Sequence, residues 1–503
     1  MKKQSGGEAM RNVWKLSVVL GCLLVAALVV VACSSGSSNM NASGMGTVSV
    51  SLSDPAACQA PSGPFAHVYV TVTDVSVNMS ATASSTDSSW VDLTPKMTPM
   101  QIDLLGEANN KCLLATLGDA LQLQAGTYQQ IRLILASNST SVTNNNCTGA
   151  ANCVVLSSDP SKNYPLLLSS EAQTGIKIPA AQMASGGLTI AAGKTEDLDI
   201  NFLTCESIVR EGNGQYRLKP VLTAGVVSAT STSINGTVVD SSTGKPVDGT
   251  VFVAAEQEVN GVYREQMATT AGTDGSFVLC PLPAGTYNLV IVAERTADKA
   301  VYMPTIVTGV QVGDTTGNVV VHLPSTVAIT TASNSTSVSL SGMVTSQNSS
   351  MAGTQADIQL SALETVNGNT YTIPMAPIEG NGMVTQSVET NASNPSATPP
   401  LTCPTGTDCA NYTMVVPSGG AYYGALSSGS VTMNGTPSGT MATYVVDGMA
   451  FVPGTTTGDC SVASPQEVKS STIALTAAGP FTPTPYPVPV PPPATALAFT
   501  SCQ

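Results

Sequence analysis

Two histidines occur in this chain of 503 residues, and neither lies in a pattern that indicates catalysis. A serine or cysteine nucleophile needs a side chain that accepts its proton, and histidine is the usual partner. His67 opens an alternating apolar segment, and His322 follows an apolar run and precedes Leu-Pro. Neither adjoins a Gly-x-Ser-x-Gly turn, so we predict no catalytic residue, no cofactor and no enzymatic activity.

Two carboxylates, Asp197 and Asp199, lie two residues apart in a segment of alternating apolar residues. Strand residues i and i+2 point to the same face, so these carboxylates share a face with Asn201. Crowded carboxylates can bind a cation or shift their pKa. We favour a solvated outer face, because the intervening apolar residues supply the core face.

Exposed aromatic rings can serve as platforms for sugars, because they offer a large apolar surface. Aromatic residues make up only 4% of the chain. Trp90 is more consistent with a core position than with a platform. Tyr422 and Tyr423, which lie in what we expect to be a Gly-rich loop, are the candidate carbohydrate-binding pair.

The N-terminus carries basic residues and then the 17-residue apolar run Leu16–Ala32, which Cys33 follows directly. A basic segment, an apolar core and a small-residue site are typical of a secretory signal. The residues Val30-Val31-Ala32-Cys33 resemble the bacterial lipobox. That resemblance implies cleavage between Ala32 and Cys33 and lipidation of Cys33. The alternative is an uncleaved membrane anchor, for which 17 residues is at the short limit.

These features predict residues 1–32 as a lipoprotein signal peptide, with Met1 or Met10 as the true start, and residues 33–45 as a flexible tether. The chain is then exported and held in the cell envelope by lipid. Ser34 follows the lipidated cysteine, which by analogy with enterobacterial sorting indicates the outer membrane.

The chain has twelve cysteines, of which Cys22 would leave with the signal peptide and Cys33 would take lipid. Among the other ten, disulfides are expected, because cysteines of exported proteins usually form them. The candidate pairs are Cys147 with Cys153, Cys403 with Cys409, Cys460 with Cys502, and Cys58 with Cys112. Cys205 and Cys280 are left over and are expected to be buried thiols. There is no Cys-x-x-Cys and no neighbouring histidine, so we predict no metal site.

The formal net charge of −14 disfavours nucleic acid as a partner, because phosphate backbones are themselves negative. Charged residues make up only 10% of the chain, whereas 42% are hydrophobic. Abundant Ser, Thr, Gly and Val, with short alternating apolar segments between turns, favour an all-β chain of tandem β-sandwich domains.

Residues 46–229 contain Val-Ser-Leu-Ser-Asp-Pro, Trp-Val-Asp-Leu, Leu-Gln-Ala-Gly-Thr-Tyr and Asp-Leu-Asp-Ile-Asn-Phe, in that order. This region resembles domain of unknown function 4382 of bacterial lipoproteins. The resemblance implies a β-sandwich and no activity. Within the region, residues 113–123 are expected to form a short helix or an irregular link.

Residues 233–324 contain Asp274-Gly-Ser-Phe277 and Leu282-Pro-Ala-Gly-Thr-Tyr287. They resemble the carboxypeptidase regulatory-like domain, which implies a transthyretin-like or carbohydrate-binding-like sandwich. Residues 337–478 contain further short alternating segments and are expected to form a third β-rich domain. Residues 479–503 are expected to be a Pro-rich tail, since a run of alternating prolines adopts an extended polyproline conformation.

Together these patterns predict a non-enzymatic, lipid-anchored protein of the cell envelope with a structural or interaction role. The alternative is a carbohydrate-binding surface lipoprotein. Its partners would be the membrane, through the N-terminal lipid, and an envelope protein or polysaccharide.

Overall fold

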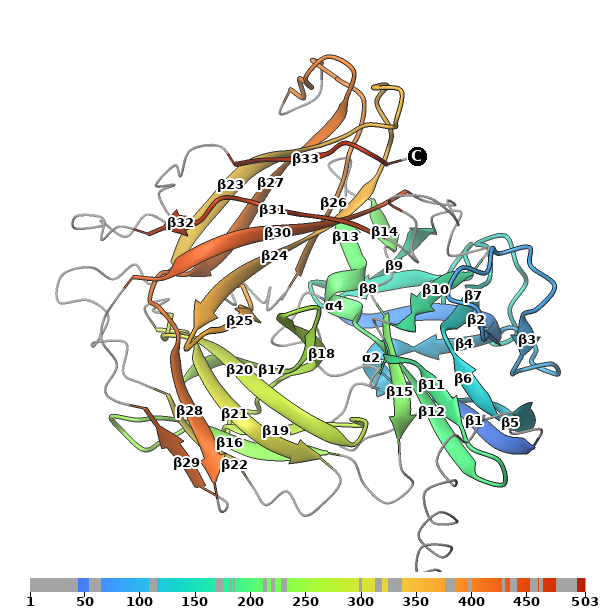
Figure 1. Ribbon diagram of the computed structural model, residues 1–503, viewed down its shortest axis with the longest axis horizontal. Helices are drawn as coiled ribbons and strands as arrows, with labels where there is room; N and C mark the ends of the chain where they lie inside the picture. Colours follow the sequence, from blue (N-terminus) through green and yellow to red (C-terminus); the bar gives the residue numbers. More distant parts are fainter. Residues whose placement is uncertain are drawn as a thin grey trace, which may run out of the picture.

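The described part of the chain consists mainly of β-strands with very little helix, as its composition predicts. The computed structural model describes residues 44–53, 65–107, 115–168, 175–180, 183, 186–210, 215–218, 222–227, 233–297, 301–312, 319–323, 337–375, 385–396, 400–427, 430–434, 441–452, 460, 465–475 and 495–502. We divide these residues into a first module (44–227), a second module (233–323) and a third module (337–502). The three lie around a common centre in Figure 1.

The first module is a sandwich of two sheets with a small hairpin sheet beside them. One sheet has the order β15 (Leu222–Val227), β12 (Thr195–Phe202), β1 (Met45–Ser53) and β5 (Ala115–Gln124). The other has the order β10 (Ile176–Pro179), β7 (Gln130–Leu135), β2 (Phe65–Asn78), β8 (Cys153–Leu156), β9 (Asp159–Leu168), β14 (Tyr216–Leu218) and β13 (Ile208–Arg210). Strands β3 (Val91–Asp92) and β4 (Met100–Asp103) pair with β2, and β11 (Leu188–Ile190) pairs with β6 (Gly126–Tyr128).

Strand β1 shows why these residues form a sandwich. Val48, Val50 and Leu52 alternate along it and are at most 2% exposed, so the period-2 pattern buries one face. Two single-turn helices, α2 (Leu104–Glu107) and α4 (Thr204–Ser207), connect strands of this module. Strand β5 replaces the helix or irregular link that we expected over residues 113–123.

The second module pairs a three-stranded sheet, β19 (Ser276–Leu279), β16 (Ile234–Asp240) and β22 (Val319–Leu323), with a much larger one. The large sheet has the order β29 (Ser430–Met433), β28 (Tyr422–Ser427), β21 (Thr305–Val312), β20 (Gly285–Arg295), β17 (Gly249–Val259), β18 (Val262–Thr270), β25 (Asn369–Thr372), β24 (Asp357–Val366), β30 (Thr443–Phe451) and β31 (Gln466–Lys469). Strands β26 (Thr385–Glu389) and β32 (Ile473–Ala474) pair with β24 and β30.

The third module shares this large sheet with the second, which the expected boundary between residues 324 and 337 does not reveal. Its other layer has the order β27 (Asp408–Pro417), β23 (Ser337–Ser346) and β33 (Thr495–Phe499). Strand β25 pairs in parallel with β18, and β28 pairs in parallel with β21. Figure 1 shows β28 and β29 alongside β21, away from the rest of the third module.

The end of the chain also departs from expectation. Strand β33 lies inside the segment 479–503, which we expected to be only a Pro-rich tail, and it pairs in parallel with β23. Leu497 and Phe499 are each 1% exposed and belong to the core of the third module. The prolines of residues 480–493 lie outside the described residues.

Side-chain contacts join all three modules. The amide of Asn201 and the hydroxyl of Thr223 in the first module both donate to the backbone carbonyl of Gln266 in the second, at 3.0 and 3.1 Å. Arg217 of the first module lies 3.5 Å from Glu389 of the third. The first module therefore contacts the other two through specific polar groups, whereas the second and third modules also share a sheet.

Candidate functional site

His67 lies on the surface beside a carboxylate. Its Nδ1 is 2.7 Å from Oδ2 of Asp103, and its side chain is 48% exposed. The imidazole also stacks on Tyr69, with ring centroids 5.5 Å apart. No serine or cysteine hydroxyl or thiol among the described residues forms a hydrogen bond with the ring, so this pair lacks a nucleophile. Sequence reasoning missed Asp103, because strand pairing between β2 and β4 brings the two side chains together.

The face of β12 that carries Asp197 and Asp199 is not the solvated surface that we favoured. Asp199 and Asn201 are each 3% exposed, and Asn201 contacts the second module. Asp197 accepts a hydrogen bond from Ser49, and Oδ2 of Asp199 accepts one from Ser53 at 2.7 Å. Burial raises the pKa of Asp199 to about 7, although the Ser53 hydroxyl lowers it in part.

The expectation failed because the second module covers the outer face of this strand. The apolar half of the expectation is confirmed, since Leu198, Ile200 and Phe202 are at most 1% exposed. Within the described residues, no group of three His, Cys, Asp or Glu side chains is placed to hold a metal ion.

Tyr422 and Tyr423 do not form a joint platform. They are consecutive residues of strand β28, opposite Thr305 and Ile306 of β21, and not part of a loop. Consecutive strand residues point to opposite faces of a sheet. Tyr423 packs against the core of the third module. The two rings therefore cannot contact one sugar together.

Three of the expected cysteine pairs form disulfides in the structure: Cys147 with Cys153, Cys403 with Cys409, and Cys460 with Cys502. Cys280 is also disulfide-bonded, so it is not the buried thiol that we expected. The side chain of Cys205 is not described. Ala32, Cys33, Cys58 and Cys112 lie outside the described residues.

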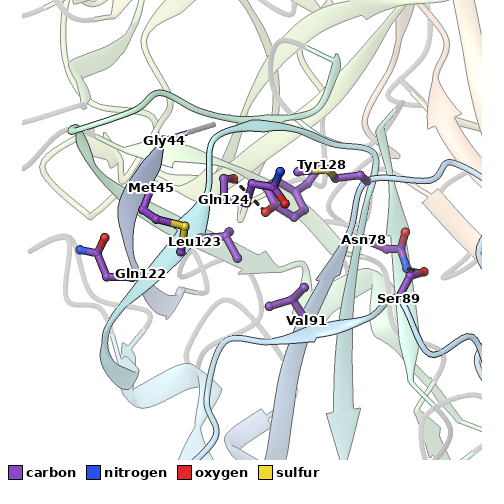
Figure 2. A pocket seen from close by; sticks show the side chains of 10 residues that line it. Gly44, Met45, Asn78, Ser89, Val91, Gln122, Leu123, Gln124 and Tyr128 are labelled. Atoms are coloured by element: carbon purple, nitrogen blue, oxygen red, sulfur yellow. Dashed lines mark hydrogen bonds between the residues drawn. The ribbon is translucent and has the colours of Figure 1, made fainter. Parts of the chain in front are cut away.

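A pocket of about 580 Å³ opens at one end of the first module, between the two sheets of the sandwich (Figure 2). This volume falls within the range of about 300–1,000 Å³ that is typical of small-molecule sites. The lining residues are Gly44, Met45, Asn78, Met79, Ser89, Val91, Gln122, Leu123, Gln124 and Tyr128. They come from β1 with the residue before it, β5 and β6 on one side, and from β2, β3 and the loop between these two strands on the other.

We call this cavity the methionine-rimmed pocket, because Met45 and Met79 are exposed at its edge. Leu123 and Tyr128 are each 2% exposed and lie deeper, as Figure 2 shows. The methyl group of Met79 lies over Gly126, where a Cβ atom would come within 2.8 Å of it. A side chain at Gly126 would therefore displace Met79 from the pocket.

The polar groups of the lining are largely occupied by one another. The Tyr128 hydroxyl donates to the carbonyl of Gln124 at 2.9 Å, and burial raises the pKa of that hydroxyl. The Asn78 amide donates to Ser89 at 2.8 Å. None of the lining side chains is charged. The pocket is therefore suited to an apolar ligand and lacks the groups that acid–base chemistry needs.

Sequence reasoning did not find this pocket. Met45 was assigned to the tether, but it is the first residue of β1. Leu123 lies in β5, for which we expected a helix or an irregular link. Only the apolar residues at the strand ends could have signalled the pocket, and their convergence depends on the packing of the two sheets.

Comparison with protein families gives one match. Residues 45–220 match the family described as domain of unknown function, DUF4382. This agrees with the resemblance seen in the sequence motifs and with the extent of the first module. No curated protein matches the sequence.

Solved structures give distant matches. The Bacillus anthracis TIE protein is 9% identical, with 91% of this chain and 50% of that chain covered and a TM-score of 0.15. A leucine-rich repeat protein from Bacteroides thetaiotaomicron is 16% identical, with 57% and 27% covered and a TM-score of 0.14. A DUF3823 family protein from Bacteroides uniformis is 14% identical, with 49% and 98% covered and a TM-score of 0.15.

The chain thus spans half the length of the TIE protein and about a quarter of the leucine-rich repeat protein. Identities and TM-scores this low carry no conclusion about function. Among the described residues, no helix has both the length and the apolar character needed to cross a bilayer.

Proposed function

We propose that this protein is a non-enzymatic, lipid-anchored component of the bacterial cell envelope, and that its three modules act as one rigid body with a structural or interaction role. The observation that carries this proposal is the large sheet shared by the second and third modules, to which the first module is joined by polar side-chain contacts. Strands that pair across a module boundary resist hinge motion, because the backbone hydrogen bonds would have to break.

A buried ion pair supports the rigid connection. Nη2 of Arg264 in β18 lies 2.5 Å from Oδ2 of Asp447 in β30 and 3.1 Å from Oε1 of Glu467 in β31. The Asp447 side chain is 1% exposed. A carboxylate buried this deeply depends on its partner, so separating the modules would leave an uncompensated charge.

The cysteine chemistry supports export. Three disulfides among the described residues are typical of proteins in an oxidising compartment outside the cytoplasm. Cys33 directly follows a basic segment and an apolar run. Lipid at Cys33 would anchor the body to a membrane, and the second module, which resembles the carboxypeptidase regulatory-like domain, would serve as a spacer. The negative net charge favours a partner other than nucleic acid.

Fractionation of the producing bacterium tests this proposal. We expect the wild-type chain in the membrane fraction, where detergent but not high salt releases it. A Cys33→Ala variant should remain as the uncleaved precursor, because the lipid-modified cysteine is the cleavage substrate in lipoproteins. A Ser34→Ala variant is the matched control and should be processed normally. Wild-type protein in the cytoplasmic fraction would refute the proposal.

A further inference from the structure

We propose that the methionine-rimmed pocket is a membrane-contact site that takes up an acyl chain of a bilayer phospholipid. The proposal rests on the proposed function in one respect, since the lipid anchor would hold this face at the bilayer. It goes further by assigning a second, non-covalent lipid site to the folded part of the first module.

Exposed apolar side chains are concentrated at this pocket. Five large hydrophobic residues are exposed among the described residues, and three of them line it: Met45 at 49%, Met79 at 40% and Val91 at 38%. Methionine is flexible and adapts to irregular apolar partners. An exposed apolar cluster beside a cavity marks a contact site more strongly than the same residues scattered over the surface.

The polar lining offers little to a polar ligand. The Asn78 amide is bonded to Ser89, and the Tyr128 hydroxyl is bonded to a backbone carbonyl. The Gln122 amide donates to the Thr47 hydroxyl at 2.7 Å. Among the lining side chains of the described residues, the Gln124 amide is the polar group left without a hydrogen bond, and no lining side chain is charged. A hydrocarbon chain is therefore the ligand whose transfer into the pocket costs the least desolvation free energy.

The position of the pocket in the chain selects a membrane lipid as its occupant. Gly44 lines the pocket, and Cys33 lies eleven residues before it. Eleven residues span at most about 40 Å, whatever their conformation. Lipid on Cys33 would therefore keep the pocket close to the bilayer and give it a high effective concentration of acyl chains.

Trp90 provides a built-in reporter. Its own side chain is not part of the lining, but it lies between Ser89 and Val91, which both line the pocket. Its indole Nε1 donates to the Ser84 carbonyl at 2.7 Å, and the Arg132 guanidinium lies 4.5 Å from its ring centroid, so its position is well defined. Trp14, the second tryptophan of the sequence, lies in the leader that cleavage before Cys33 would remove, and replacing it keeps Trp90 the single indole even where the leader is retained. A Trp14→Phe background therefore leaves Trp90 as the single indole fluorophore.

The experiment uses the full-length, membrane-extracted protein in that background, reconstituted into phosphatidylcholine vesicles whose acyl chains carry bromine. Bromine quenches indole fluorescence at short range. We expect strong quenching of Trp90. The double variant Met45→Ser with Met79→Ser should reduce the quenched fraction severalfold, because each methionine withdrawn from hydrocarbon lowers partitioning by a factor of about five. Met351→Ser, which changes a 65% exposed methionine of the third module, should quench like wild type.

Thermal melting of each variant verifies that it is folded. Equal quenching in wild type and the double variant, or no quenching in either, would overturn the proposal. Quenching by brominated free fatty acid but not by brominated vesicles would also overturn it, since the occupant would then come from solution.

Mass analysis of the same preparations separates this proposal from the proposed function. Lipidated Cys33 without Trp90 quenching removes the pocket proposal and leaves the anchor. Quenching with an unmodified Cys33 supports the pocket and removes the anchor.

Discussion

Replacing Asp199 with asparagine should change how the stability of the protein depends on pH. The Asp199 side chain is buried on the face of β12 that meets the second module, with 3% exposure. Its Oδ2 accepts a hydrogen bond from Ser53, whereas its Oδ1 has no hydrogen-bond partner among the described residues. Burial raises the pKa of this carboxyl from 3.8 to about 7.

The sign follows from which state binds the proton. Below pH 4 the carboxyl is protonated in the folded and unfolded chains alike. Between pH 4 and 7 the unfolded chain releases the proton while the folded chain keeps it, so stability falls as the pH rises. The difference between 3.8 and about 7 corresponds to a loss of at most about 4 kcal/mol above pH 7.

Asparagine has a similar shape, can still accept a hydrogen bond from Ser53 and carries no charge at any pH. We expect the free energy of unfolding of Asp199→Asn, relative to wild type, to rise by up to about 4 kcal/mol between pH 4 and pH 8. Urea denaturation at pH 4, 5.5, 7 and 8, followed by circular dichroism, measures this difference.

Asn201→Asp is the matched control on the same face, since Asn201 is also 3% exposed. A carboxyl at this position faces the Gln266 carbonyl and should make stability fall more steeply with pH than in wild type. If the curves of wild type and Asp199→Asn stay parallel across the pH range, our account of this buried carboxyl is wrong.

Two further predictions concern the third module and its contact with the second. Arg264→Met should destabilise the protein by about 3–5 kcal/mol in urea denaturation, because it leaves Asp447 buried without its partner. Lys469→Met removes a partly exposed ion pair with Glu467 and should lower the free energy of unfolding by less than about 1 kcal/mol. An equal loss of stability in the Arg264→Met and Lys469→Met variants would contradict this ranking. Replacing Cys460 and Cys502 with serine removes a disulfide between residues 42 apart in the sequence and should lower the free energy of unfolding by about 4 kcal/mol. An unchanged melting temperature in calorimetry would contradict this prediction.

The strands were largely predictable because alternation is a local property. Val48, Val50 and Leu52 repeat with period 2, and the structure buries all three. Cysteines six residues apart in a polar loop were predictable for a similar reason, since a short loop brings them together without help from the rest of the fold.

The pairing of distant strands was not predictable. Alternation shows which face of a strand is buried but not which strand lies beside it. We therefore expected Tyr422 to lie in a loop, although the structure places it in a strand that pairs with Thr305, more than a hundred residues earlier. We expected Asp199 to be exposed to solvent for the same reason. The second module covers it, and that module begins after residue 227, so the local pattern around Asp199 does not reveal the contact.

The candidate site was the least predictable part. The methionine-rimmed pocket gathers residues from five strands and a loop, and each of them is unremarkable in its own segment. Met45 lies at the very start of β1, where a strand and a tether have the same local pattern. These residues become neighbours only when the two sheets pack against each other.

Intact-mass analysis of the membrane-extracted protein tests the lipid anchor most directly. We predict a chain that begins at Cys33, lacks residues 1–32 and carries the added mass of diacylglycerol with or without a further acyl chain. A chain with an unmodified Cys33 thiol, or one that retains the leader, would contradict the account.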